Sequence, residues 1–442
     1  MIVLSGAALV LADRILSPGT LVIDEGRIAD VRPDAPSAHA ESHFAFHGHY
    51  IVPGFIDVHV HGVDGIDSLD VLAAGDAVAA IAERLPRYGV TAFCPTTVAC
   101  APADLRRVLD QVRRARAAPA PRTARVLPAH LESNFINPAY SGAQPASCLR
   151  SPRSALTATL KGSPYTEPKG SPYTDVDNRR STDADNRRST LSGSTPSDEF
   201  TASDILAEIE RAAPDVGIVT LAPELDGGLD LVRWLSSRGH HVSLGHSGAT
   251  YEQALEAIAA GARHATHLFN RMPPLGHRAP GLAGAVLQAE EIAAEIICDG
   301  VHVHPALVRT AIAAKRPSRV FAITDATAAA GLPVGSRAAL GGQPITAGPS
   351  TALLPDGTIA GSVVTMDKAF EVLVGQVGLS LVDAATICST TPARELGLIG
   401  YGILAVGSAA DLVVLDSQLS VVQTYIGGQL VYARNTATTP SV

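Results

Sequence analysis

Short apolar runs alternate with longer amphipathic stretches through the middle of the chain, a pattern typical of an α/β protein. The amphipathic stretches are predicted helices, for example over residues 102–117, 202–212 and 251–260. The apolar runs are predicted strands and cover residues 54–60, 92–97, 126–131, 217–222, 241–245, 264–268, 295–299 and 320–324. This repetition predicts a (β/α)8 barrel. A doubly wound open sheet is disfavoured, because no glycine-rich phosphate-binding turn follows the first strand.

The two ends of the chain have a different pattern. Apolar and polar residues alternate around Gly and Asp turns over residues 1–52, and a similar alternation recurs over 411–416 and 421–432. Such alternation predicts hairpins, and we expect a strand rather than a secretion signal over residues 1–13. The chain is therefore predicted to comprise a barrel over 53–334 and a small β-sandwich domain formed by both termini, 1–52 plus 335–442.

One segment interrupts the barrel pattern. Residues 151–199 contain the sequence Lys-Gly-Ser-Pro-Tyr-Thr twice and the sequence Asp-Asn-Arg-Arg-Ser-Thr twice, with few large aliphatic residues. A stretch of this kind buries too little apolar surface to offset the entropy lost on ordering. We expect a disordered insertion within the barrel, with a lid over a site as the alternative.

Composition and charge narrow the classes of partner. The 442 residues include 34 basic and 43 acidic side chains, a formal net charge of −9. This balance argues against nucleic acid and anionic membranes, although a single local arginine could still bind an anionic small molecule. No apolar run approaches the ~18 residues that span a bilayer. The five cysteines are odd in number and scattered, which favours a reducing, cytoplasmic location.

Side chains suited to metal binding or proton transfer gather at the predicted strand ends. In a (β/α)8 barrel these ends form the mouth of the active site. Any one of these histidines alone would more often be a hydrogen-bonded structural residue, but their joint placement favours a metal-dependent site. The residues are His59, His61, Glu132, His246, His267, His302, His304 and Asp325.

Five motifs together resemble the amidohydrolase superfamily and, within it, the N-acetylglucosamine-6-phosphate deacetylase family. They are Pro53-Gly-Phe-Ile-Asp-Val-His-Val-His, His130-Leu-Glu, Gly245-His-Ser-Gly-Ala-Thr-Tyr, Thr266-His-Leu-Phe-Asn-Arg-Met and Ile323-Thr-Asp. The resemblance covers nearly the whole chain except residues 151–199. It implies a homodimeric, metal-dependent hydrolase that converts N-acetylglucosamine 6-phosphate to glucosamine 6-phosphate and acetate.

The candidate metal ligands fit this chemistry. Glu132, His246 and His267 supply one carboxylate and two imidazoles, a set that suits Zn²⁺ or Fe²⁺ and leaves a position open for water. A bound ion of this kind lowers the pKa of water toward ~7 and so provides the nucleophile. His59 and His61 could hold a second ion, and the choice between one and two ions stays open. Asp325 resembles the family's catalytic residue, which acts as general base and then as general acid.

Other positions resemble the family's substrate contacts. Arg278 matches the arginine that binds the phosphate, often supplied by the neighbouring subunit, and a guanidinium suits phosphate because it donates two parallel hydrogen bonds. The remaining candidates for contacts with the sugar are Asn270, Arg271, His302, Ala360 and Gly361.

The chain departs from the family pattern at two places. Ser133-Asn134 stands where the family usually has Gly-Pro, and Gln144 stands in place of a histidine that polarises the acetyl carbonyl. Gln144 can donate a hydrogen bond to that carbonyl but carries no positive charge. N-acetylgalactosamine 6-phosphate and other N-acyl compounds therefore stay open as substrates. A non-catalytic metal-binding barrel is disfavoured, because it would not need Asp325.

Overall fold

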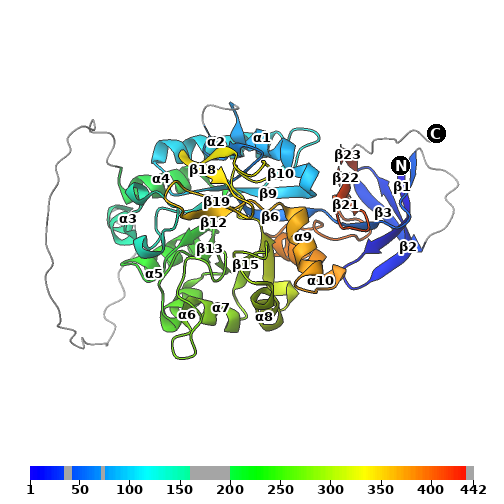
Figure 1. Cartoon of the computed structure of the whole chain (residues 1–442). Coiled ribbons are helices and arrows are strands. Elements are labelled where there is room, and N and C mark those ends of the chain that lie inside the picture. The colour runs from blue at the N-terminus through cyan, green and yellow to red at the C-terminus, as the bar shows by residue number, and fades with distance from the viewer. Residues whose placement is uncertain (34–41, 71–74, 160–199, 435–442) are drawn as a thin grey trace.

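A barrel of parallel strands forms the centre of the protein (Figure 1). The structure is a computed structural model that describes residues 1–33, 42–70, 75–159 and 200–434. An isolated bridge between Val60 and Ala326 joins the first strand to the end of the last. The predicted barrel is confirmed by the strands β6 (Phe55–Val60), β9 (Val90–Thr97), β10 (Arg125–Val126), β11 (Ala129–Glu132), β12 (Val216–Leu221), β13 (His241–Leu244), β14 (His264–Ala265), β15 (Ala293–Ile297) and β16 (Val320–Ile323).

The helices around the barrel begin and end at local sequence signals. The side chains of Thr201 and Thr250 accept hydrogen bonds at the starts of α4 and α6 in reciprocal capping boxes, and α6 ends at Gly261. The three helices predicted from periodicity have the predicted bounds. In the described part of the chain, no helix is long and apolar enough to cross a membrane. The helices are α1 (Ala77–Arg84), α2 (Pro102–Ala117), α4 (Ala202–Ala212), α5 (Gly228–Ser237), α6 (Tyr251–Ala260), α7 (Gly281–Gln288) and α8 (Pro305–Lys315).

Both ends of the chain contribute to one β domain beside the barrel, as predicted (Figure 1). Its sheet has the order β23-β22-β21-β5-β1-β2-β3, and β4 also pairs with β1. Leu4, Ile51 and Leu412 lie in the hydrophobic core of this domain. The strands are β1 (Ile2–Val10), β2 (Ile15–Asp24), β3 (Arg27–Pro33), β4 (Ser42–Ala45), β5 (Tyr50–Pro53), β21 (Leu412–Leu415), β22 (Val421–Ile426) and β23 (Gln429–Ala433).

The segment after the barrel corrects the predicted boundary at residue 335. A separate antiparallel sheet forms there, and its last strand bridges to the barrel through Ser362 and Ala326. Leu340 and Phe370 pack in the core of the barrel, whereas Leu404 packs in that of the β domain. The segment contains β17 (Arg337–Leu340), β18 (Gln343–Ala347), β19 (Thr351–Leu353), β20 (Ile359–Ser362), α9 (Met366–Gly375), α10 (Leu381–Ala385) and α11 (Thr391–Glu395).

Part of the expected insertion is a helix. Residues Pro152–Thr159 form α3, and Ala155 and Leu156 are buried in the core of the barrel. The expectation of disorder is wrong for residues 152–159. This part precedes the repeated sequences, and its two buried apolar residues pack the helix against the protein. The rest of the predicted insertion, residues 160–199, lies outside the described residues.

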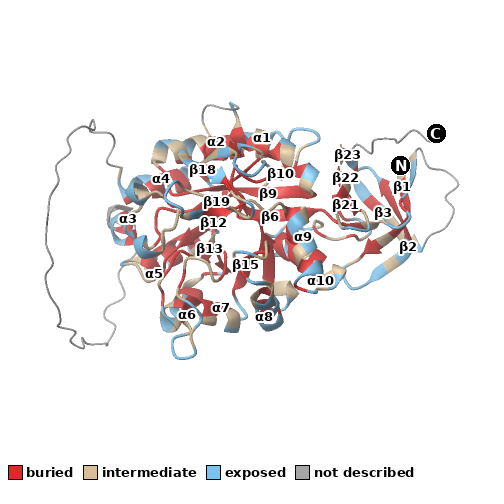
Figure 2. Ribbon diagram, viewed as in Figure 1, coloured by how far each residue is buried: buried red, intermediate tan, exposed pale blue. Residues whose placement is uncertain are grey.

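Burial follows the layers of the barrel (Figure 2). Most residues of the barrel strands are buried, while the surrounding helices expose their outer faces. Inside the barrel, away from the strand ends that carry the polar residues, apolar side chains such as Val58, Ile218 and Phe321 fill the space. This packed interior leaves the carboxyl ends of the strands as the place for polar chemistry.

Candidate functional site

The carboxyl ends of the barrel strands surround a cavity of about 450 Å³. His59 is fully buried just beneath the wall, with its Nε2 atom 3.2 Å from Nε2 of His61. The structure therefore brings together nearly all of the predicted site residues. Those on the cavity wall are His61, Glu132, Gln144, His246, His267, Asn270, Arg271, His302, Asp325, Ala360 and Gly361.

Glu132, His246 and His267 form a first cluster of candidate metal ligands. Oε1 of Glu132 lies 2.9 Å from Nε2 of each histidine, and the two Nε2 atoms are 3.0 Å apart. Burial opposes ionisation of the carboxyl, but the adjacent imidazoles hold the pKa of Glu132 well below its usual range. One carboxylate and two imidazoles thus converge on a common point, as a divalent transition metal requires.

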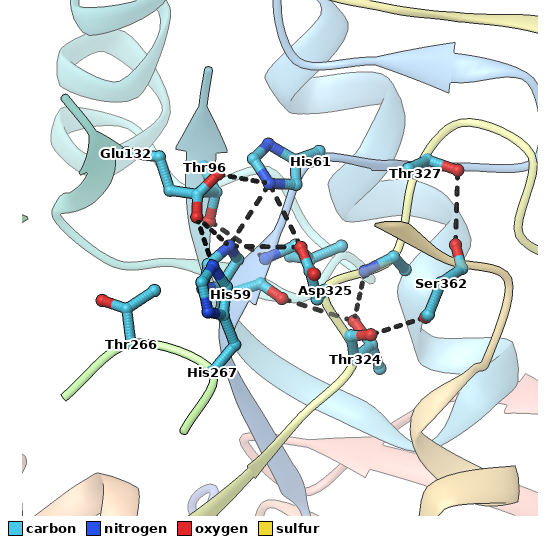
Figure 3. A network of polar contacts seen from close by, with 12 residues as sticks. His59, His61, Thr96, Glu132, Thr266, His267, Thr324, Asp325, Thr327 and Ser362 are labelled. Carbon is cyan, nitrogen blue, oxygen red and sulfur yellow. Dashed lines mark hydrogen bonds and ion pairs between the residues drawn. The ribbon is translucent and has the colours of Figure 1, made fainter. Parts of the chain in front are cut away.

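His59, His61 and Asp325 form a second cluster beside the first (Figure 3). Oδ1 of Asp325 is 3.3 Å from Nε2 of both histidines. Glu132 connects the clusters, since its two oxygens lie 3.7 Å from His59 Nε2 and 3.3 Å from His61 Nε2. The geometry fits two neighbouring ions that share Glu132.

The electrostatics of these clusters favour a cation. Among the residues that the structure describes, only imidazoles form ion pairs with Glu132 and Asp325. Burial works against a charged His61, yet hydrogen bonds with Asp325 and Glu132 raise the pKa of His61 to about 10. Burial lowers the pKa of His59 well below its usual range, so its lone pair is available to a metal. The donors therefore fit a divalent ion.

Unusual backbone conformations hold several of these side chains. His246, His267 and Asp325 follow their strands with φ angles of +48°, +29° and +47°. The left-handed conformation costs a non-glycine residue about 1–3 kcal/mol and persists only where its surroundings enforce it. Glu224 is one such constraint, since its carboxylate accepts hydrogen bonds from Ser247 and from the N–H of Gly248, directly after His246.

The cavity wall also presents polar atoms without a protein partner. Nδ2 of Asn270 and Nε2 of His302 are buried and have no hydrogen-bond partner in the described part of the chain. The ring of His302 is fixed from its other side, because Nδ1 donates to Asp299 at 2.6 Å. Since an unsatisfied buried polar group costs about 1–3 kcal/mol, these two atoms are suited to bind a polar ligand.

The departures from the family pattern have different structural roles. Gln144 lies on the cavity wall, where its amide accepts a hydrogen bond from Ala99 N–H at 2.7 Å and donates one to Glu132. Ser133 instead donates to the carbonyl of Thr220, and Asn134 donates to two backbone carbonyls of neighbouring loops. Only Gln144 is therefore placed to affect a ligand directly.

Two predicted positions lie away from the cavity. Arg278 is exposed and forms no hydrogen bond or ion pair within the described residues. His304 caps α8, where its Nδ1 atom accepts a hydrogen bond from Ala306 N–H at 3.2 Å. The grouping of His304 with the mouth residues is therefore wrong, because its side chain caps the start of α8 and does not line the cavity.

Two buried acids were missed in the sequence. Glu295 on β15 lies 3.0 Å from Nδ1 of His59, and burial raises the pKa of Glu295 well above its usual range. Asp57 accepts a hydrogen bond from the Thr324 hydroxyl at 2.5 Å, and burial raises the pKa of Asp57 to about 7. Asp57 lies two residues before His59 on β6, and Glu295 is the one charged residue of β15, but neither position by itself indicates its buried partner.

Comparison with known proteins supports the fold and identifies the family. Residues 50–431 match the amidohydrolase family. The chain is 31% identical to the N-acetylglucosamine-6-phosphate deacetylase of Bacillus subtilis, covering 96% of each protein. It is 35% identical to the human enzyme of the same name, covering 96% of this chain and 91% of that protein.

The chain is also similar to solved structures of N-acetylglucosamine-6-phosphate deacetylases. The N-acetylglucosamine-6-phosphate deacetylase of Thermotoga maritima superimposes with a TM-score of 0.77 at 27% identity, covering 98% of this chain and all of that one. A variant of the Mycobacterium smegmatis deacetylase, solved in complex with N-acetyl-D-glucosamine-6-phosphate, gives a TM-score of 0.79 at 30% identity. That alignment covers 97% of this chain and 99% of the other.

The first cluster predicts tight binding of a divalent metal. We expect the Glu132→Gln substitution to weaken metal binding by more than about 100-fold, because it removes the only carboxylate among the three ligands. Equilibrium dialysis followed by elemental analysis measures this loss. The His302→Asn variant serves as the control, since His302 lies on the cavity wall outside both clusters. Equal metal affinity in the Glu132→Gln and wild-type proteins would contradict the ligand assignment.

Proposed function

The chain belongs to the amidohydrolase family and to its N-acetylglucosamine-6-phosphate deacetylases, and we propose that it hydrolyses N-acetylglucosamine 6-phosphate to glucosamine 6-phosphate and acetate. The observation that carries this proposal is the joint placement of Glu132, His246, His267 and Asp325 at the floor of one cavity. Metal ligands alone would suffice for a binding protein. An additional carboxylate beside them supplies what amide hydrolysis needs, a group that moves protons.

Asp325 is the proposed catalytic residue. Amide hydrolysis requires that the attacking water lose a proton and that the departing amine gain one. The carboxylate of Asp325 accepts the first proton and returns it to the nitrogen of the sugar. A divalent ion, when bound, supplies the Lewis acid that lowers the pKa of water and polarises the acetyl carbonyl. One or two ions, Zn²⁺ or Fe²⁺, suit the ligand set of His59, His61, Glu132, His246 and His267.

Hydrogen bonds on both sides hold Asp325 in place. Its N–H donates to the carbonyl of His59 at 2.9 Å, and its own carbonyl accepts from Ser362 N–H at 2.9 Å. The Ser362 hydroxyl donates to the carbonyl of Thr324 (Figure 3). This loop is therefore anchored to the first barrel strand and to β20, which keeps the carboxylate aimed at the histidines.

The cavity wall contains groups suited to the sugar and its acetyl group. Gln144 uses one amide hydrogen for Glu132, and its second can donate to the acetyl carbonyl. Asn270 and His302 contribute the two unpartnered polar atoms for hydroxyls of the sugar. Arg271 lies on the same wall and donates to the carbonyl of Ile359 at 3.1 Å, close to Ala360 and Gly361. These groups suit a sugar substrate that carries an acetyl group.

We propose that Arg278 binds the phosphate of a substrate that occupies the partner subunit's cavity. Its guanidinium is exposed and does not line the cavity of its own chain. A homodimer in which each subunit lends Arg278 to the other would supply the positive charge. All five cysteines are free thiols, which supports a cytoplasmic location for such a dimer.

A panel of N-acetyl sugars tests the activity. We expect the metal-loaded protein to release acetate fastest from N-acetylglucosamine 6-phosphate, more slowly from N-acetylgalactosamine 6-phosphate and least from unphosphorylated N-acetylglucosamine. Colorimetric detection of free amine and enzymatic detection of acetate measure the two products independently. Failure with every phosphorylated sugar would reject the proposed substrate class.

The Asp325→Asn variant tests the proton-transfer role. We expect kcat to fall by about 10³-fold, because an amide cannot accept and return the proton. Metal binding at the first cluster should stay close to wild type, since Asp325 does not belong to that cluster. Thermal unfolding should also stay close to wild type, because the amide preserves the size of the side chain. Steady-state kinetics checks this with Asp299→Asn as a comparison, because Asp299 contacts His302 rather than the metal clusters. Near-wild-type turnover in Asp325→Asn would reject the assignment.

The Arg278→Ala variant tests the phosphate contact. We expect KM to rise by about 10- to 100-fold with little change in kcat, because charge-assisted hydrogen bonds contribute roughly 1.5–3 kcal/mol. Mixed dimers decide which subunit supplies the arginine. Co-expression of Arg278→Ala with Asp325→Asn should restore activity only if Arg278 acts across the interface, since one site then has both residues. Unchanged KM in Arg278→Ala contradicts the contact itself.

A further inference from the structure

A second cavity, of about 510 Å³, opens at the amino-terminal ends of the barrel strands, away from the mouth that holds the candidate metal ligands. Its wall comes mainly from the first residues of β10, β12 and β13, from residues at or just after the ends of α2, α4 and α5, and from the segment that follows α11. No described residue lines both cavities, so this one is separate from the proposed active site. Cavities of about 300–1,000 Å³ are of a size that binds small organic ligands.

Three arginines line this cavity, whereas no aspartate or glutamate of the described chain does. Such a wall is unexpected in a chain with a net charge of −9. Each arginine pairs with an acid that lies outside the lining, so the arginines are held in place without a ligand. The pairs are Arg116 with Asp215, Arg125 with Asp411 and Arg238 with Glu210.

The ion pairs around Arg116 leave one positive charge without an acid. Asp215 accepts hydrogen bonds from both Arg113 and Arg116, and Arg113 in turn lies 3.9 Å from Asp110. Among the described residues, this connected network has more arginines than acids. An anion of one charge in the cavity would therefore balance it. The arginines are Arg106, Arg113, Arg116 and Arg211, and the acids are Asp110, Glu208 and Asp215.

Each of the three lining arginines keeps a terminal nitrogen without a partner among the described residues. Arg116 uses only Nη1, for Asp215 and for the carbonyl of Pro214. Arg125 uses Nε and Nη2, and Arg238 uses Nε and Nη1. Because a guanidinium carries five N–H donors, the remaining nitrogens can donate to an anion while the existing ion pairs stay intact.

The rest of the wall is mostly apolar. Leu127, Leu396 and Leu398 line it together with the ring of Tyr401. The guanidinium of Arg125 lies over that ring, 5.2 Å from its centroid, so apolar surface and positive charge are adjacent. A ligand that fits both parts has a hydrocarbon or aromatic body and one anionic group.

Three histidines lie at the same end of the barrel. His240 and His241 line the cavity, and burial lowers the pKa of both, which keeps them neutral. Nδ1 of His240 donates to the carbonyl of Val216 at 2.9 Å, which leaves Nε2 as an acceptor without a partner in the described chain. The ring of His241 stacks on that of His264 with 5.0 Å between centroids, and neither nitrogen of His264 has a partner among the described residues. This end of the barrel therefore holds polar groups that stability alone would not require.

We propose that this cavity is a second ligand site and binds a small carboxylic acid with an apolar body. The carboxylate accepts hydrogen bonds from the three arginines, and the apolar body packs against the leucines and Tyr401. A phosphate monoester fits less well, since its second charge would exceed the single positive charge that the ion pairs leave over. The proposal goes beyond the proposed function and is independent of it, because the cavity shares no described residue with the barrel mouth.

Isothermal titration calorimetry of the metal-free protein with two acids of different shape tests the site. We expect the wild type to bind one 2-naphthoate or one decanoate per chain, and the tighter of the two identifies an aromatic or an aliphatic body as the better fit. The uncharged 2-naphthamide should bind about 10- to 100-fold more weakly than 2-naphthoate, because it lacks the charge-assisted hydrogen bonds. Since neither metal nor sugar is needed, inactivity toward every amino sugar would reject the proposed function and leave this site standing.

The Arg116→Ala variant removes one donor from the site. We expect it to bind 2-naphthoate about 10- to 100-fold more weakly, while Asp215 stays paired with Arg113 and the fold is kept. Arg107→Ala is the matched control and should bind as the wild type does, since Arg107 lies on the same helix, pairs with Asp104 and lines neither cavity. Leu398→Trp, which fills the cavity, should abolish binding.

Several outcomes would overturn the proposal. They are a wild type that binds neither acid, equal affinity for 2-naphthoate in Arg116→Ala and wild type, equal affinity for the acid and its amide, and tighter binding of 2-naphthyl phosphate than of 2-naphthoate. Displacement of the acid by N-acetylglucosamine 6-phosphate also overturns it, because the acid would then lie at the barrel mouth. If Arg116→Ala does not fold, as judged by circular dichroism, Leu398→Trp carries the test, and unchanged affinity in that variant rejects the site.

Discussion

Glu132 is a carboxylate buried among four imidazoles, and the rest of the site depends on how that charge is balanced. The Nε2 atoms of His246 and His267 lie 2.9 Å from it, and those of His61 and His59 lie at 3.3 Å and 3.7 Å. Desolvating one such anion costs several kcal/mol unless opposite charge compensates. The imidazoles offer lone pairs to a divalent ion, and the charge of that ion would balance the negative charge of Glu132.

The barrel makes this convergence possible because its strands end at one rim. The ligands lie at or just after the ends of β6, β11, β13 and β14, and Asp325 follows β16, so no single element could bring them together. Left-handed backbone at His246, His267 and Asp325 adds local strain. The packed apolar interior and the sheet of β17–β20 offset that strain, and Ser362 of β20 holds the loop of Asp325 directly. Rigidity of the scaffold is therefore what keeps the ligands in place.

The sequence predicts most of this site and part of its support. Strand ends were predictable because apolar runs of barrel length stop at polar residues, and α2, α4 and α6 were predictable from their amphipathic periodicity. The sheet of β17–β20 was not, since alternation at residues 337–362 does not tell which core a hairpin joins. Glu295 was concealed because one acid in an apolar strand resembles a strand end, and its partner His59 lies 236 positions away in the chain.

The net charge of −9 raises the question of how such a chain would bind a phosphorylated sugar. The two ends of the proposed substrate place opposite demands on the cavity. At its floor, bound metal would neutralise Glu132 and Asp325, so the acetyl group meets no net repulsion there. Among the described residues at its wall, the single guanidinium is that of Arg271, which already donates to a backbone carbonyl. A dianionic phosphate needs a further cation, and the exposed Arg278 does not line the cavity of its own chain. If Arg278 binds the phosphate as proposed, a second subunit would complete the contact, and dimerisation rather than overall charge would set the affinity for the anion.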